Sequence, residues 1–123
     1  MAQLMAYDPD PNMNWDAVKT LGHELKTFTD SGEALDYAHK NQVDIALLDT
    51  SEGIDMIKHL REISPYFKVI LLSESPKLEN IRQALGYAPC AFLFKPIVAG
   101  ELDACLKRSL LKGKSTIKGS LNL

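Results

Sequence analysis

The chain has 123 residues, 46% of them hydrophobic and 24% charged, which is typical of one compact globular domain with its own core. The 14 Lys and Arg and 16 Asp and Glu give a formal net charge of -2, so charge gives no reason to expect direct binding to nucleic acid or to an anionic membrane. No apolar run is long enough to cross a bilayer, and the N-terminal residues lack the basic start and long apolar stretch of a signal peptide. We therefore expect a cytoplasmic protein without a membrane segment.

The first elements are short. Residues 3–7 (QLMAY) predict a strand that must end where Pro9 and Pro11 follow, because proline cannot donate to a central strand. An asparagine at position 12 or 14 can cap a short helix that reaches about Leu21, and Gly22 ends it. Residues 25–28 predict a weak strand.

The middle of the chain carries stronger patterns. Residues 29–40 contain an Asp or Ser cap and one apolar face, which predicts a two-turn helix. Residues 43–48 are nearly all apolar, as expected of a strand covered on both faces. The segment after Asp49 places apolar residues at helical spacing and is stopped by Pro65, which predicts a third helix.

The remaining elements repeat the alternation. Residues 68–72 and 91–94 predict the fourth and fifth strands, and a helix between them runs from Pro76 to Gly86. A last helix is predicted from about Ala99 to Leu111, with its inward positions at Leu102, Cys105, Leu106 and Leu110. Residues 113–123 are rich in Gly, Ser and Lys, so we expect a linker or the start of an absent output domain after a domain at 1–112.

Strict alternation of strands and helices predicts the fold class. Right-handed crossovers give an α/β domain with a doubly wound, five-stranded parallel sheet. In such folds binding chemistry gathers at the carboxyl ends of the strands. Asp8 and Asp10 follow the first strand and Asp49 follows the third, while Ser73 follows the fourth and Lys95 the fifth. We therefore expect these polar groups to meet at one edge of the sheet.

This set, ending in Lys95-Pro96, resembles the receiver domain of bacterial two-component response regulators. The segments that carry the likeness are DSGEAL, VDIALLD, GIDMIKHLREI, VILLS and FLFKPI, and they extend over roughly residues 3–111. The resemblance implies a (βα)5 flavodoxin-like fold and a signalling switch rather than an enzyme. It implies that Asp49 accepts a phosphoryl group from a sensor histidine kinase.

The resemblance also implies roles for the neighbours of Asp49. Lys95 would pair with a phosphoryl oxygen, and Ser73 would hydrogen-bond to another. Mg²⁺ would be held by the acidic residues and would neutralise charge on the transferring group. Phe92 stands where the family carries an aromatic residue that swings inward on activation; its alternative is a plain core or surface aromatic.

The sequence departs from the family at two places. Pro9 stands where a second acidic metal ligand is usual, so Mg²⁺ binding is expected to be weak. Asp10 could replace that ligand if the backbone stays extended, because residues two apart on a strand point the same way. The segment after Asp49 is also shorter than usual. Ser51 would still offer a backbone carbonyl to the metal, and Glu52 would favour the helix N-terminus or reach back into the site.

The resemblance implies an output through the surface of the fourth helix, fifth strand and last helix, which contacts either an output domain or a second copy. Arg82, Asp103, Lys107 and Arg108 could form charged contacts there. Nucleic acid would be bound only by an output domain absent from this sequence, as in a transcriptional regulator. The alternative is a phosphorylation-independent pseudo-receiver that acts as an interaction or dimerisation module. A nucleotide-binding enzyme is not expected, because Asp8-Pro9-Asp10-Pro11 is acidic and rigid where a phosphate needs a Gly-rich loop.

Overall fold

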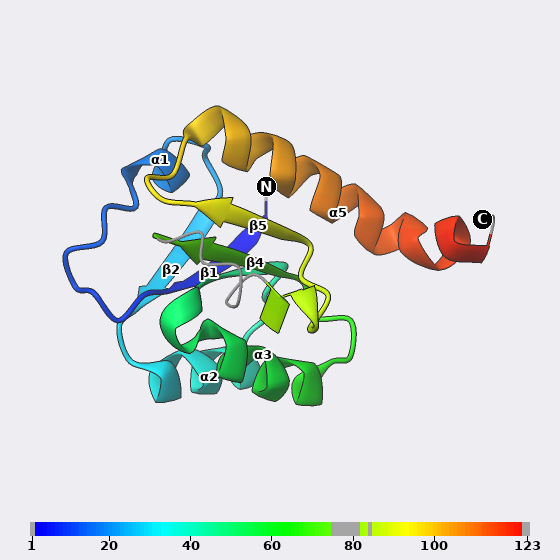
Figure 1. Cartoon of the computed structure of the whole chain (residues 1–123), viewed down its shortest axis with the longest axis horizontal. Coiled ribbons are helices and arrows are strands. Elements are labelled where there is room, and N and C mark those ends of the chain that lie inside the picture. The colour runs from blue at the N-terminus through cyan, green and yellow to red at the C-terminus, as the bar shows by residue number, and fades with distance from the viewer. Residues whose placement is uncertain (1, 75–81, 84, 122–123) are drawn as a thin grey trace.

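A computed structural model of the chain describes residues 2–74, 82–83 and 85–121. Five parallel strands form one sheet in the order β2-β1-β3-β4-β5, and helices cover both of its faces (Figure 1). The predicted α/β class with a five-stranded, doubly wound parallel sheet is confirmed. In chain order the elements are β1 (Gln3–Tyr7), α1 (Asp16–Lys19), β2 (Glu24–Phe28), α2 (Ser31–Lys40), β3 (Ile45–Asp49), α3 (Thr50–Ile63), β4 (Val69–Ser73), β5 (Ala91–Phe94) and α5 (Ala99–Leu121).

The core lies in two layers, one on each face of the sheet. Alternate residues of β1, β3 and β4 face α1 and α5, where Trp15, Val18, Leu102 and Leu106 are buried. The other residues of the same strands face α2 and α3 and meet Ala34, Ala38, Ile57 and Leu60. Each fully buried aliphatic side chain contributes about 1.5–3 kcal/mol. Both faces of the three central strands are therefore packed, and the sheet adopts a register in which Leu4 pairs with Ile45 and Ala46 with Val69.

That register decides where the polar residues of the strand ends lie. Asp49 pairs with Leu72 of β4, and Ser73 pairs with Phe94 of β5. All five strands run in the same direction, so their carboxyl ends form a single edge. Asp8 follows β1 at that edge, and its backbone N–H donates to the carbonyl of Phe28 at 3.1 Å. Lys95 follows β5, and its backbone N–H donates to the carbonyl of Ser73 at 2.7 Å.

Two boundaries differ from those predicted. β3 contains Asp49, and α3 begins at the next residue, because the Asp49 side chain itself caps the helix by accepting from the Ser51 N–H. The last helix does not end at Leu111 but continues to Leu121. No proline interrupts residues 99–121, and a helix nucleated by its packed first turns extends by one hydrogen bond per added residue.

Two other expectations have different outcomes. The helix predicted from Pro76 to Gly86 lies mostly outside the described residues, although residues 82, 83 and 85 are helical. α1 is a single turn, Asp16–Lys19, and Asn14 accepts from the Asp16 N–H at 2.8 Å. Gly22 adopts a left-handed backbone with φ of 81°, which lets the chain turn into β2.

Candidate functional site

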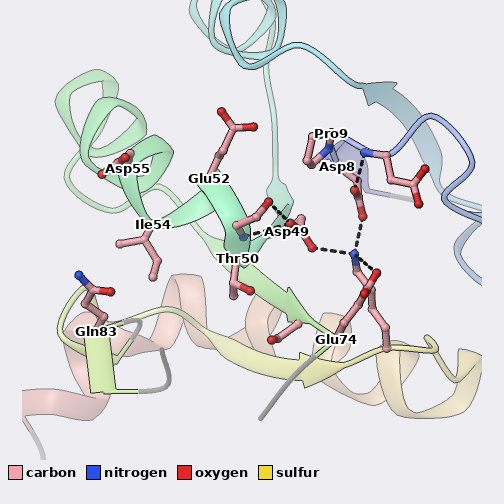
Figure 2. A pocket seen from close by; sticks show the side chains of 13 residues that line it. Asp8, Pro9, Asp49, Thr50, Glu52, Ile54, Asp55, Glu74 and Gln83 are labelled. Atoms are coloured by element: carbon pink, nitrogen blue, oxygen red, sulfur yellow. Dashed lines mark hydrogen bonds and ion pairs between the residues drawn. The ribbon is translucent and has the colours of Figure 1, made fainter. Parts of the chain in front are cut away.

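A cavity of about 600 Å³ opens at the carboxyl edge of the sheet, between the ends of β1, β3, β4 and β5. Among the residues that the structure describes, its wall contains six carboxylates and one cationic side chain, Lys95; Figure 2 shows this cavity. The carboxylates belong to Asp8, Asp10, Asp49, Glu52, Asp55 and Glu74. Such an excess of acidic groups disfavours an anion unless a cation accompanies it.

Lys95 joins the two buried carboxylates of the cavity. Its ammonium lies 2.6 Å from Asp49 Oδ1 and 2.5 Å from Asp8 Oδ2, while the exposed carboxylate of Glu74 lies 3.8 Å away. Asp8 is 3% exposed and Asp49 is 8% exposed. Two buried acids with like charge would repel each other, so a cation between them is required for both to stay ionised.

Asp49 has a second set of partners in the first turn of α3. Its Oδ2 accepts from the backbone N–H of Ser51 at 3.0 Å and from the Ser51 hydroxyl. The residue therefore ends β3 and caps α3 at the same time, with one oxygen toward Lys95 and the other toward the helix. A carboxylate at a helix N-terminus is further stabilised by the positive end of the helix dipole.

These contacts set the protonation states. Burial raises the pKa of Asp49, but the hydrogen bonds from Lys95 and Ser51 outweigh burial and hold the pKa below its ordinary value of 3.8. Burial lowers the pKa of Lys95, and the hydrogen bonds to Asp49 and Asp8 outweigh it, so the pKa lies above 10.5. At neutral pH the acid is a carboxylate and the lysine is an ammonium ion.

Asp10 does not lie on an extended chain beside Asp8. Its backbone N–H donates to Asp8 Oδ1 at 2.9 Å, which closes a turn across Pro9, and its own carboxylate caps the Asn12 N–H at 2.9 Å. The condition for Asp10 to replace the missing ligand at position 9 is therefore not met, because proline fixes φ and bends the chain there. Asp10 still lines the cavity, from an exposed position.

Ser51 is predicted to offer a backbone carbonyl to a metal. In the structure it lies in the first turn of α3, and the carbonyls of a helix point along its axis toward the C-terminus. Use of this carbonyl as a ligand would require the first turn to unwind. The prediction stays untested, and the helical conformation does not favour it.

The two predicted switch residues lie on neighbouring strands. Ser73 ends β4, is 2% exposed and lines the cavity. Phe92 is half-buried on β5, where it packs toward the α3 side of the sheet and meets Phe94 edge-to-face at 5.3 Å between ring centroids. Their roles in switching stay predictions.

The structure adds a contact that the sequence did not show. The hydroxyl of Tyr7 donates to Glu52 Oε2 at 2.5 Å, although the two residues lie 45 positions apart. Burial, with the hydrogen bond to Glu52 next, raises the pKa of Tyr7 well above 10. The only hint of this contact in the sequence is Tyr7 itself, the single aromatic residue of the segment QLMAY. Two alternatives were open for Glu52, a role at the helix N-terminus and a position in the site. Its place is compatible with both, because it lies in the first turn of α3 and lines the cavity.

The donor set suits a hard divalent cation that keeps much of its water. Among the described residues no three His, Cys, Asp or Glu side chains are grouped to hold a metal by themselves. Mg²⁺ needs only one or two carboxylates, together with waters and phosphate oxygens. Asp8 and Asp49 supply two buried carboxylates beside an acidic cavity, so the residues present fit such an ion.

Within the described part of the chain, no helix combines the length and the apolar character that a bilayer crossing needs. The histidines and cysteines do not contribute to the cavity wall. Cys105 is buried in α5, as its inward position predicts, whereas Cys90 is exposed just before β5; both are free thiols.

Comparisons with known proteins agree with this geometry. Two PrrA transcriptional regulatory proteins, from Mycobacterium tuberculosis and Mycobacterium bovis, are 30% identical over 103 residues, which is 80% of this chain and 44% of theirs. The CheY-like receiver domain of Methanospirillum hungatei superposes with a TM-score of 0.83 at 20% identity, over 94% of this chain and 98% of that one. CheY4 of Vibrio cholerae superposes with a TM-score of 0.76 at 24% identity, over 89% and 99% of the two chains.

The strongest assignment comes from the sequence family itself. The model of the response regulator receiver domain matches residues 14–107, which include α1 through the first part of α5. The fold, the polar residues at the strand ends and the family match all lead to the same assignment. The chain therefore belongs to the family of response regulator receiver domains.

Proposed function

We propose that Asp49 is the phosphoacceptor of this receiver domain and that the chain acts as a reversible switch rather than as an enzyme that turns over a substrate. The observation that carries the proposal is the position of Asp49. It is an ionised carboxylate at the end of β3, 2.6 Å from a lysine ammonium, in the wall of a cavity of about 600 Å³. An ionised carboxylate is a nucleophile for phosphorus, and its acyl phosphate product hydrolyses readily, so the signal decays.

The neighbours support this role. In the transfer, an Asp49 oxygen forms a bond to phosphorus while the bond from phosphorus to the phosphohistidine nitrogen of the kinase breaks. Lys95 already forms an ion pair with Asp49, and its ammonium can interact with the phosphoryl oxygens when they carry the negative charge. Ser73, at the same edge, offers a hydroxyl to another oxygen. The added charge of about -1.5 to -2 is enough to draw the end of β4 toward the site.

Receiver domains generally use Mg²⁺, and in this chain we assign Asp8 and Asp49 as the residues that would hold it. When bound, the ion neutralises negative charge on the transferring group. Asp8 already has both oxygens engaged, one by Lys95 and one by the Asp10 N–H. Binding must therefore compete with Lys95 for Asp8, which together with Pro9 supports the expectation of weak affinity.

The partners follow from the family. We propose a sensor histidine kinase as the phosphoryl donor and a cytoplasmic location. The PrrA relatives are named transcriptional regulatory proteins, and this chain spans 44% of their length. By analogy, an output domain that follows residue 112 would bind nucleic acid. β5 and α5 would transmit the signal, with Asp103, Lys107 and Arg108 as charged contacts; Arg82 is exposed on the segment before β5.

The test is intact-mass analysis after incubation with acetyl phosphate, with and without Mg²⁺, for the wild type and Asp49→Ala. We expect one phosphoryl adduct that requires both Mg²⁺ and Asp49. Circular dichroism of Asp49→Ala shows that a missing adduct does not reflect unfolding. Absence of an adduct from the wild type at every Mg²⁺ concentration would contradict the proposal and favour a phosphorylation-independent module.

A further inference from the structure

The space beside Asp49 is bordered by Pro9 on one side and by Glu52 on the other. Both residues line the same cavity, and Figure 2 shows them across the open region next to Asp49. Proline has no side-chain oxygen, so Asp8 is the buried carboxylate on the β1 side of this region, and Asp10 lines the cavity from an exposed position. Any second acidic contribution to a cation must come from one of the other carboxylates of the cavity wall.

Three of those carboxylates either have other partners or lie farther from the open region beside Asp49. Asp10 caps the Asn12 N–H from an exposed position beyond the turn at Pro9. Glu74 has a side chain that is 76% exposed, and its carboxylate lies 3.8 Å from the Lys95 ammonium. Asp55 is exposed, as Glu52 is, but it lies nearly one turn farther along α3. Glu52 is the remaining candidate.

Glu52 differs from the other three because a buried group orients it. Tyr7 is 1% exposed, and its ring belongs to the core between the sheet and α3. Its hydroxyl donates to Oε2 of Glu52, which lines the cavity, at 2.5 Å. A carboxylate has about four acceptor sites, so one hydrogen bond leaves capacity for others.

We infer that Glu52, oriented by Tyr7, supplies the acidic group that Pro9 cannot, by accepting hydrogen bonds from water bound to the divalent cation at Asp8 and Asp49. The inference rests on the proposed function. Mg²⁺ releases its water reluctantly and retains several molecules in protein sites, so a carboxylate beyond the direct ligands suits it. Tyr7 limits the conformations of the glutamate before the ion arrives, which reduces the entropy lost on binding.

The test is a calorimetric titration of the full, unphosphorylated chain with Mg²⁺. Loss of a group that hydrogen-bonds to the direct ligands of a metal weakens metal affinity by about tenfold or more. We therefore expect Glu52→Gln to raise the Kd for Mg²⁺ by that factor. Asp55→Asn is the matched control, because it removes the same charge from the same wall of the cavity. We expect its Kd to change by less than about threefold, since charges in water are screened.

Tyr7→Phe separates orientation from charge, because it removes the hydroxyl and leaves the ring in the core. We expect Tyr7→Phe to weaken Mg²⁺ binding less than Glu52→Gln does, and to add nothing in the double variant, because the hydroxyl acts through Glu52. Additive losses in the double variant would overturn the positioning role of Tyr7. Equal Kd values for Glu52→Gln and Asp55→Asn would overturn the role of Glu52.

Phosphoryl labelling distinguishes a failed inference from a failed function. If the inference holds, Glu52→Gln accepts a phosphoryl group from acetyl phosphate, but at about tenfold higher Mg²⁺ than the wild type needs. If the wild type is labelled and Glu52→Gln needs no more Mg²⁺, the inference alone is wrong. If the wild type neither binds Mg²⁺ nor is labelled, both the inference and the proposed function are wrong.

Discussion

At the scale of single residues, the site depends on how charge is balanced in a buried place. Asp8 and Asp49 are nearly inaccessible to solvent, and the Lys95 ammonium lies within 2.6 Å of both. The Lys95 ammonium balances the negative charge of these two carboxylates, and a bound cation would have to share that role with it. The same ion pair therefore stabilises the fold and weakens cation binding, so the two properties oppose each other at Lys95.

This balance predicts a pH dependence of folding stability. The pKa of Asp49 is lower in the folded chain than its ordinary 3.8, so its contribution is present above that value and is lost as pH falls through the folded pKa. The pKa of Lys95 is raised above 10.5, so its contribution is present below that value and is lost as pH rises through the folded pKa. The paired contribution should be complete between about pH 5 and pH 9.

Urea unfolding of the wild type and Asp49→Asn from pH 7 down to pH 3 measures the acid side. We expect the difference in unfolding free energy, wild type minus variant, to fall as the solution becomes more acidic, because only the wild type must protonate this carboxylate. The other acidic groups titrate in both proteins and cancel in the difference. A difference that does not change with pH would show that the Lys95 pair does not favour the ionised form.

At the scale of elements, Asp49, the proposed phosphoacceptor, is also the N-terminal cap of the helix that follows it. Asp49 Oδ2 accepts from the Ser51 N–H, so α3 begins without a connecting loop. In a longer connection the nucleophile and the helix would be separate. Here any change at the Asp49 carboxylate acts on the first turn of α3, where Glu52 also contacts Tyr7 of β1.

A pair of substitutions tests this dual role. Asp49→Ala removes the cap, which typically costs about 0.5–2 kcal/mol of helix stability, whereas Asn is as good a cap as Asp. We expect hydrogen exchange of the amides of residues 51–53 to accelerate in Asp49→Ala and to stay near the wild-type rate in Asp49→Asn. Amides in the last turn of α3 serve as the internal reference. Equal acceleration in both variants would mean that charge, not capping, holds the turn.

At the scale of the whole molecule, alternation of strand and helix patterns was sufficient to predict the sheet. A parallel sheet brings its carboxyl ends together, so the meeting of Asp8, Asp49, Ser73 and Lys95 around one cavity followed from their places after the strands. The features that the sequence did not predict depend on the three-dimensional path of the chain. The turn across Pro9 and the contact of Tyr7 with Glu52 leave no periodic signal, because one is local geometry and the other joins distant residues.

The path of α5 beyond the sheet is the feature that bears most on the proposed domain limit. Figure 1 shows the helix running past the end of the sheet toward the C-terminus. Among the described side chains of α5, the buried ones are Leu102, Cys105, Leu106 and Ser109. All four lie before residue 112, so the described contacts that hold α5 to the sheet fall within the proposed domain at 1–112.

A shortened chain of residues 1–112 should therefore fold with nearly full stability. We expect its unfolding free energy in urea to lie within about 1 kcal/mol of the whole chain, as for changes away from buried contacts. Leu106→Ala in the whole chain is the control, because loss of a fully buried leucine costs about 2–5 kcal/mol. If the truncation costs as much as Leu106→Ala, residues 113–121 contribute to the core and the domain extends through the end of α5. A small cost would leave those residues as a helical extension whose orientation is set by the packing of Leu102 and Leu106.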